Sequence, residues 1–255
     1  MGLIRQTLIV ANWKMHKTID EAVQFCQDFL PLVADVSKVD MAICPPFISL
    51  DRVSQLLVGE KVSLGAQNVF YEENGAYTGE ISPLMLKDVN CNYALVGHSE
   101  RRHIIGERDE AINKKVKAVL AHDIIPILCV GETLAEREDH KAKEVVKKQL
   151  EKAMNEIVLD NNALVIAYEP VWAIGTGINA SADDAEEMSF FIREHLAKLY
   201  SNSIAEKTII LYGGSVKTDN IGDFLSRDNV DGALVGGASL DASSFANLIR
   251  IGENV

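Results

Sequence analysis

The sequence is poor in cysteine, and its few cysteines follow no pattern of a disulfide or metal-binding framework. The 255 residues include four, which lie 18, 47 and 38 positions apart at Cys26, Cys44, Cys91 and Cys129. No Cys-x-x-Cys pair occurs, so the usual local scaffold of a tetrahedral zinc site is missing. Unpatterned cysteines in a chain of this length are typical of a reducing compartment. We therefore expect a cytoplasmic protein without a metal site.

Long apolar runs and an excess of basic residues are also missing. No segment approaches the roughly 20 apolar residues of a membrane-spanning helix. The first residues, MGLIRQTLIVANWKM, contain too short an apolar stretch for a signal peptide. Lys and Arg number 25 against 37 Asp and Glu, which gives a net charge of -12. Because an acidic surface repels polyanions, we expect neither nucleic acid nor a membrane as a partner.

Eight short apolar runs recur along the chain, about 32 residues apart. They are continuous rather than alternating, which is typical of strands that are buried on both faces of a parallel sheet. Segments with helical periodicity lie between them, at residues 18–30, 138–158 and 182–199. The eight runs begin near Leu8, Met41, Leu64, Tyr93, Ile124, Leu164, Ile209 and Ala233.

This alternation of strand and helix predicts an α/β fold, for which two architectures compete. An open doubly wound sheet usually has about five to seven strands. Eight strand–helix units in about 250 residues match a closed (β/α)8 barrel, which is the architecture we expect. No linker or shift in composition divides the chain, so we expect one domain over residues 1–255. The longest loop, residues 67–82, is long enough to indicate a functional or docking segment.

The residues after the apolar runs include a plausible acid–base set. In a barrel of this kind, active-site residues come from the carboxyl ends of the strands and the loops that follow them. Asn12 and Lys14 follow the first run, His98 follows the fourth, and Glu169 follows the sixth. Singly, these residues also have structural interpretations, as a solvated lysine, a hydrogen-bonded turn histidine or a glutamate in a turn. Together, on one rim, they can bind a charge and move a proton.

The turns after the last two runs are suited to an anion. Gly213, Gly214 and Ser215 follow the seventh run, and Gly236 and Gly237 follow the eighth. Barrels commonly bind phosphate at these two turns. Glycine lets backbone N–H groups approach an anion closely, because no Cβ intervenes. The sequence therefore predicts a phosphate site beside the acid–base set.

Five segments resemble the triosephosphate isomerases, in the same order and from end to end. They are ANWKM at 11–15, VGHSERR at 96–102, AYEPVWAIGTG at 167–177, YGGSV at 212–216 and VGGASL at 235–240. The resemblance implies a TIM barrel that interconverts dihydroxyacetone phosphate and D-glyceraldehyde 3-phosphate through an enediol(ate), in glycolysis and gluconeogenesis. It implies no cofactor, because the carbonyl of the substrate is itself the electron sink.

The resemblance also implies roles for individual residues. Glu169 is the base, His98 a neutral electrophile at the carbonyl oxygens, and Lys14 a positive charge for the phosphate and the enediolate, while Asn12 donates a hydrogen bond. These acid and base roles are already established for the family. A helix that begins near Ser99 would aim its N–H groups at His98 and lower the pKa of the imidazole.

Substrate binding, the lid and the partner follow from the same resemblance. The phosphate would be held by Gly175, Ser215, Gly236 and Gly237 as well as by Lys14 and Asn12. The lid at 171–176 would close over it, and the family's hinge lysine is replaced at Ile178. A homodimer is implied, in which Thr78 of the loop at 67–82 contacts the partner's site. Either a catalytic or a structural role remains open for Glu100.

Two other functions remain to be compared with the isomerase. A Schiff-base lyase on the same barrel would use Lys14 as its nucleophile. A noncatalytic phosphate-binding barrel would have no need to retain Glu169, His98 and Lys14 together. The segment Gly175-x-Gly177-x-x-Ala180 formally resembles a dinucleotide fingerprint, but it does not directly follow a strand.

Overall fold

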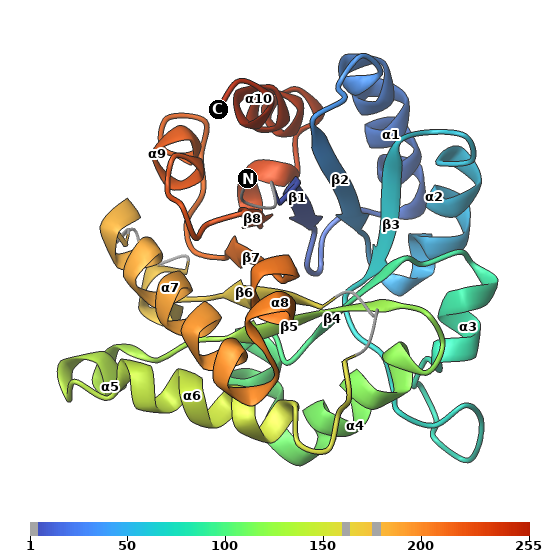
Figure 1. Cartoon of the computed structure of the whole chain (residues 1–255). Helices are drawn as coiled ribbons and strands as arrows, with labels where there is room; N and C mark the ends of the chain where they lie inside the picture. Colours follow the sequence, from blue (N-terminus) through green and yellow to red (C-terminus); the bar gives the residue numbers. More distant parts are fainter. Residues whose placement is uncertain (1–4, 160–163, 175–179) are drawn as a thin grey trace.

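A closed barrel of eight parallel strands forms the centre of the molecule (Figure 1). The computed structural model describes residues 5–159, 164–174 and 180–255. Neighbours in the barrel are also neighbours in the sequence, and β1 pairs with β8, where Leu8 lies opposite Gly232. The predicted (β/α)8 barrel is thus confirmed. The strands are β1 (Thr7–Asn12), β2 (Val39–Cys44), β3 (Val62–Ala66), β4 (Tyr93–Val96), β5 (Ile125–Val130), β6 (Val165–Tyr168), β7 (Ile209–Tyr212) and β8 (Gly232–Val235).

Helices surround the barrel, and α1 packs against α10 beside it (Figure 1). Within the described ranges they are α1 (Ile19–Val33), α2 (Leu50–Leu56), α3 (Pro83–Asp88), α4 (Asp109–Leu120), α5 (Leu134–Glu138), α6 (Ala142–Ala153), α7 (Ala182–Leu199), α8 (Asn202–Lys207), α9 (Ile221–Leu225) and α10 (Ala242–Glu253). Short helical turns occupy Phe47–Ser49 (η1), Arg101–Ile105 (η2), Val171–Ala173 (η3) and Gly237–Ser239 (η4).

Local capping explains where two of the predicted helices begin. Thr18 and Glu21 form a capping box before α1, which continues past the predicted end at residue 30 to Val33. Ser181 and Asp184 form another before α7, whose bounds match the predicted helix at 182–199. In each case the side chains satisfy backbone N–H groups that the first helical turn leaves unpaired.

The helix predicted at 138–158 is present as α6 (Ala142–Ala153), but both of its predicted bounds are wrong. A capping box of Thr133 and Glu136 starts α5 upstream of the predicted helix. His140 then takes a left-handed conformation with φ 58°, and the chain turns before α6 begins at Ala142. Helix α6 ends at Ala153. The charged residues between the two helices carry no apolar stripe that would hold a continuous helix against the barrel.

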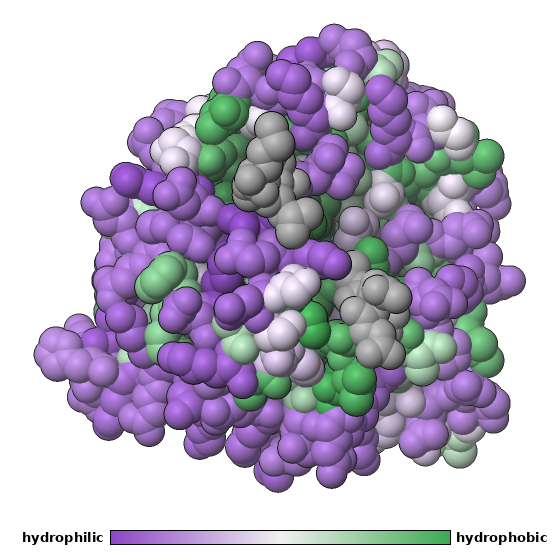
Figure 2. Space-filling model, in the orientation of Figure 1, coloured by the Kyte–Doolittle hydropathy of each residue, from purple (hydrophilic) through white to green (hydrophobic). Residues whose placement is uncertain are grey.

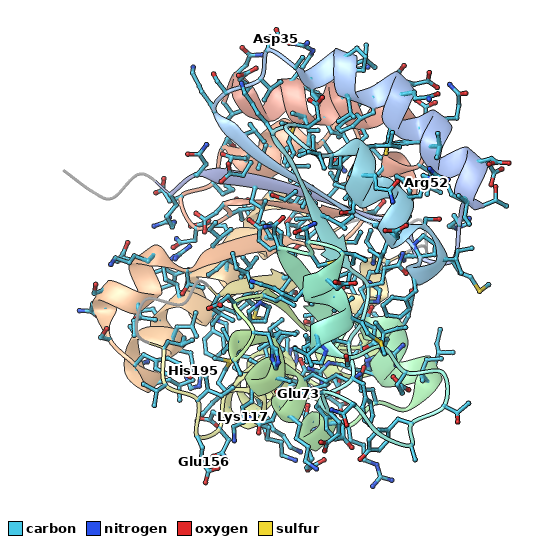
Figure 3. All side chains as sticks on the ribbon, turned by 90° about the vertical axis from the view of Figure 1, so that its right-hand side faces the viewer. Asp35, Arg52, Glu73, Lys117, Glu156 and His195 are labelled. Carbon is cyan, nitrogen blue, oxygen red and sulfur yellow. The ribbon has the colours of Figure 1, made fainter. Side chains whose placement is uncertain are left out.

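The surface is largely hydrophilic on the face shown in Figure 2, where apolar residues form separate patches. Exposed ion pairs connect neighbouring segments, such as Lys117 on α4 and Glu156 after α6, which are 3.4 Å apart and are both labelled in Figure 3. The predicted loop at 67–82 contains neither helix nor strand, and residues 72–80 are exposed. None of the helices in the described ranges is long and apolar enough to cross a membrane.

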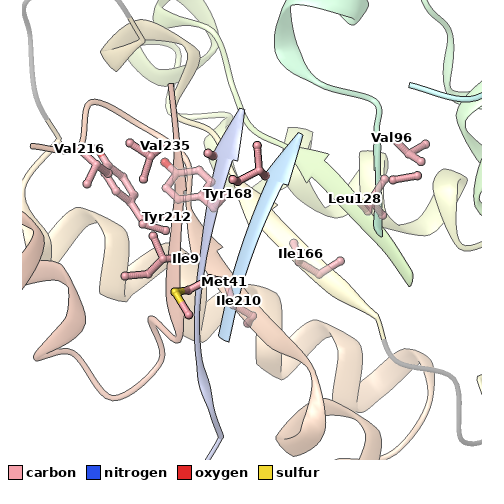
Figure 4. Packing of buried hydrophobic residues seen from close by; sticks show 14 of the residues in the cluster. Ile9, Met41, Val96, Leu128, Ile166, Tyr168, Ile210, Tyr212, Val216 and Val235 are labelled. Atoms are coloured by element: carbon pink, nitrogen blue, oxygen red, sulfur yellow. The ribbon is translucent and has the colours of Figure 1, made fainter. Parts of the chain in front are cut away.

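Alternation along the strands divides the core into two layers. One buried cluster consists only of strand residues, among them Leu8 and Val10 of β1 and Val165 and Ala167 of β6, and it fills the barrel. The other lies between the strands and the helices and includes Ile9, Met41, Tyr168 and Tyr212 (Figure 4). Strand side chains alternate between two faces.

Candidate active site

The inward side of the strands continues into polar residues at the carboxyl end of the barrel. Asn12 lies two residues beyond Val10 on β1, and Glu169 lies two residues beyond Ala167 on β6, so both keep the inward parity. Both are buried, with 4% and 2% of their surface exposed. Sequence position alone thus directs an amide and a carboxylate into the mouth of the barrel.

A cavity of about 440 Å³ opens at this end. It brings together all the predicted site residues except Gly175, which lies outside the described residues. Its lining consists of Asn12, Lys14, His98, Glu169, Ile174, Gly213, Gly214, Ser215, Val216, Lys217, Leu234, Gly236, Gly237 and Ala238. The size suits a small ligand, and polar groups converge on it from several strands.

Glu169 and His98 are in direct contact at the centre of the site. Oε1 of Glu169 is 2.9 Å from Nε2 of His98, and its Oε2 accepts a hydrogen bond of 2.9 Å from the backbone N–H of Ser99. The N–H of Glu100 points at Nδ1 of His98 at 3.2 Å. This arrangement requires a hydrogen on Nε2 and a lone pair on Nδ1, the tautomer of a neutral imidazole that donates into the cavity.

The pKa values of this pair move in opposite directions. Burial raises the pKa of the Glu169 carboxyl, but His98 and the N–H of Ser99 lower it more, so the net pKa lies below the ordinary value. Burial lowers the pKa of His98, but the Glu169 carboxylate raises it more, and the net pKa lies above the ordinary value. The expectation of a lowered pKa for His98 is therefore wrong for this arrangement. The predicted helical turn does begin at Ser99, but the adjacent carboxylate outweighs its N–H groups.

Lys14 and Asn12 line the same cavity. Lys14 has a left-handed backbone with φ 53°, and its N–H donates to Oδ1 of Asn12 at 3.1 Å. Nζ of Lys14 pairs with Oε1 of Glu100 at 2.7 Å, and the Glu100 carboxylate also approaches Nδ1 of His98 at 3.6 Å. Glu100 thus contacts both side chains, but it does not line the cavity that holds Glu169.

The turn after β7 allows a close approach that a larger residue would prevent, whereas the turn after β8 has more space. A Cβ at Gly213 would stand 2.9 Å from Cγ of Glu169, and one at Gly236 would stand 3.4 Å from Cε of Lys14. Gly236 precedes η4, whose Ser239 donates from Oγ to the carbonyl groups of Val235 and Gly236. The Ser239 hydroxyl therefore fixes the conformation of the turn after β8.

Several residues of this region lie outside the set predicted from the sequence. Leu234 and Lys217 also line the cavity. The sequence could have indicated both, because Leu234 is at an inward position of β8 and Lys217 comes directly after the YGGSV segment. Glu132 comes two residues after β5 and is fully buried. Its carboxylate accepts hydrogen bonds from the hydroxyl of Tyr168 at 3.1 Å and from Nε1 of Trp172 at 2.8 Å. Burial raises the pKa of Glu132 above the ordinary value.

The site offers acid–base chemistry and anion binding. A buried carboxylate, an imidazole that donates from Nε2 and an ammonium face one cavity, beside turns whose N–H groups can face an anion. Among the described residues, no group of three or more His, Cys, Asp or Glu could hold a metal ion. All four cysteines are buried free thiols.

Comparison with known proteins agrees with this geometry. The family model described as triosephosphate isomerase matches residues 7–252. A triosephosphate isomerase of Caldanaerobacter subterraneus subsp. tengcongensis is 50% identical over 248 residues, which cover 97% of this chain and 100% of the relative. One from Finegoldia magna is 51% identical over 254 residues, which cover 98% of this chain and 100% of the relative. The chain therefore belongs to the triosephosphate isomerase family.

Proposed function

We propose that the protein interconverts dihydroxyacetone phosphate and D-glyceraldehyde 3-phosphate by proton transfer between adjacent carbons, a reaction of glycolysis and gluconeogenesis. The observation that carries this proposal is the contact between Glu169 and His98 in a cavity that also contains Lys14 and two glycine turns. An aldose–ketose isomerisation needs a base at carbon, a donor at oxygen and a clamp for the phosphate, and each has a counterpart in this cavity.

Glu169 acts as the base. Its carboxylate removes a proton from the carbon beside the carbonyl group. The C–H electrons form the C=C bond of an enediolate, and the negative charge moves to the carbonyl oxygen. His98 gives a proton to this oxygen and takes the hydroxyl proton of the carbon that Glu169 deprotonated. Glu169 then returns its proton to the neighbouring carbon, and the hydroxyl oxygen that lost its proton becomes the new carbonyl oxygen. The lowered pKa keeps Glu169 ionised at neutral pH, and its burial places the charge where no bulk water competes for it.

His98 donates from Nε2 to the substrate oxygens. For this to happen, the Glu169 carboxylate leaves Nε2 and the Ser99 N–H, and the substrate carbonyl takes its place. The departure removes the larger of the two charges that raise the pKa of His98. Burial, the Lys14 charge and the Glu100 N–H then favour the neutral imidazole, against the Glu100 carboxylate alone. The departure also removes the contacts that lower the pKa of Glu169 and makes the carboxylate a stronger base. Substrate binding therefore prepares both groups.

The phosphate lies between Lys14 and the turns after β7 and β8. Lys14 supplies positive charge to the phosphate and to the developing enediolate, and Asn12 donates a hydrogen bond beside it. Backbone N–H groups at Ser215, Gly236 and Gly237 hold the phosphate oxygens, since these residues line the cavity. Gly175 and the rest of the lid belong to the same proposal, although Gly175 is outside the described residues.

A homodimer is the proposed assembly, in the cytoplasm. A second cavity of about 490 Å³ adjoins the active site, shares Asn12, Lys14 and His98 with it, and is lined by apolar side chains such as Met15 and Ile104. Met15 is 96% exposed in the single chain. The exposed segment at 72–80 of a partner, with Thr78, would cover these residues. Sedimentation analysis tests this, and a monomer at micromolar concentration would contradict it.

The experiment that tests the activity is a coupled assay with D-glyceraldehyde 3-phosphate on the wild type and on Glu169→Asp. Absence of turnover in the wild type would overturn the proposed isomerase activity. Turnover that Glu169→Asp leaves unchanged would keep the reaction and reject Glu169 as the base. Borohydride treatment with substrate separates the lyase alternative, because only a Schiff base at Lys14 would be trapped as a stable adduct.

A further inference from the structure

A second lysine in the loop after β1 reaches across to the turn after β8. Nζ of Lys17 donates a hydrogen bond of 2.7 Å to the carbonyl oxygen of Leu240, which lies 223 positions away in the sequence. Leu240 directly follows η4 as its C-cap, and η4 is the short helix that begins beside Gly236. Lys17 thus connects the first strand–helix loop to the last one, at the carboxyl end of the barrel.

The ammonium group of Lys17 is held by aromatic rings as well as by the carbonyl. Nζ is 4.9 Å from the centre of the Phe25 ring and 5.3 Å from that of Trp13. The two rings contact each other edge to face at 4.8 Å, and both are buried. A cation over aromatic faces is attracted by their quadrupoles, so these rings fix the position of Nζ.

The backbone of Lys17 is in an unfavourable conformation. Its φ is 74°, in the left-handed region that costs a residue with a Cβ more than glycine. The hydrogen bond and the aromatic contacts offset that cost. A glycine would satisfy the turn but would provide no side chain for the bridge.

Both ends of this bridge carry residues of the proposed phosphate site. Lys14 lies three positions before Lys17, and its Cε would be 3.4 Å from a Cβ at Gly236. Gly236 and Gly237 lie just before Leu240 and line the cavity with Lys14. The separation between the Lys14 ammonium and the N–H groups of the β8 turn therefore depends on how these two loops are held together.

We propose that Lys17 is a positioning residue for phosphate binding, which fixes the Lys14 loop against the β8 turn so that both contact the phosphate together. The inference rests on the proposed function of this site. Lys17 does not touch the phosphate. It reduces the reorganisation that binding would otherwise require, and such preorganisation increases affinity without a new contact.

The test compares Lys17→Met with Lys61→Met. Lys61 is a matched control, because its Nζ donates to the carbonyl oxygen of Val36 at 2.9 Å between two loops at the other end of the barrel. For Lys17→Met we expect the Kd of inorganic phosphate, measured by calorimetry, and the KM to rise about fivefold, with kcat within about twofold of the wild type. Lys17→Arg should restore most of the affinity, because arginine can also donate to Leu240 and stack on the rings.

The outcomes separate this proposal from the proposed function. An unchanged phosphate Kd in Lys17→Met, or a rise equal to that in Lys61→Met, would overturn the role of Lys17, as would a loss confined to kcat. If Lys17→Met does not fold, Lys17→Gly keeps the left-handed backbone and must show the same weakened phosphate binding. A wild-type protein that binds phosphate but does not turn over the triose would overturn the proposed isomerase activity. The calorimetric Kd of phosphate would still test the positioning role of Lys17.

Discussion

Replacing Gly213 with alanine would displace the proposed base without changing any functional group. The added Cβ would stand 2.9 Å from Cγ of Glu169 and 3.3 Å from the carbonyl oxygen of Tyr168. Gly213 is outside the left-handed region, so the backbone accepts alanine and the effect comes from contact alone. Ordinary carbon–carbon contact begins at about 3.4 Å, and Cγ of Glu169 must therefore move by roughly 0.5 Å.

The size of that movement sets the expected loss. A misplacement of about 1 Å at a reacting group can cost about a hundredfold in rate, so a shift of roughly 0.5 Å corresponds to about tenfold in kcat. This equals about 1.4 kcal/mol of activation free energy. The KM should change little, because the added Cβ meets only Glu169 and Tyr168 and none of the residues proposed to hold the phosphate. Overpacking should lower the free energy of unfolding by about 1–3 kcal/mol.

Steady-state kinetics with D-glyceraldehyde 3-phosphate would measure the loss, and a crystal structure would locate the carboxylate. Gly222→Ala is the matched control, because a Cβ there meets only Ile251, at an ordinary distance of 3.7 Å. A Gly213→Ala enzyme with wild-type kcat and an undisplaced Glu169 would refute the steric argument. A rise in KM with unchanged kcat would refute the claim that the added methyl group acts by displacing the base.

Three further changes test the charges of the molecule. Lys14→Ala should weaken the binding of inorganic phosphate by about tenfold or more in calorimetry, and unchanged affinity would contradict its electrostatic role. Glu169→Gln should lower the pKa of His98 in an NMR titration, because the carboxylate charge is what raises it; a pKa equal to that of the wild type would reject this cause. Asp231→Asn should cost about 3 kcal/mol in urea unfolding, because Asp231 is buried and pairs with Arg193 at 2.7 Å. A decrease in the free energy of unfolding below about 1 kcal/mol would show that this ion pair contributes little to stability.

Much of the fold could be predicted because the strands are buried on both faces. Such strands read as continuous apolar runs, and the observed strand starts fall within about two residues of the predicted ones. The rule that active sites lie at the carboxyl ends of strands then selected Asn12, His98 and Glu169. The fold brings these residues into one cavity although they are far apart in the sequence.

The features that could not be predicted depend on distances between segments. The raised pKa of His98 results from a carboxylate 2.9 Å away on another strand, a distance that no local pattern contains. The break before α6 depends on the left-handed His140, which sequence periodicity does not reveal. Lys17 is one lysine among many in the sequence, and only the hydrogen bond to Leu240 distinguishes it.

The net charge of -12 likewise shows that the total charge of a chain does not reveal how charges are arranged around a site. Summed over the chain, it argues against nucleic acid, which contacts a wide surface, but it does not show where a small anion would bind. A small dianion experiences mainly the charges within about 8 Å, since salt screens the more distant ones. Within the cavity these include the charge of Lys14 and the partial charges of the backbone N–H groups in the glycine turns. A count of ionisable residues does not include the N–H groups. Affinity for phosphate should therefore fall steeply when Lys14 is removed and only slightly when surface carboxylates far from the cavity are neutralised.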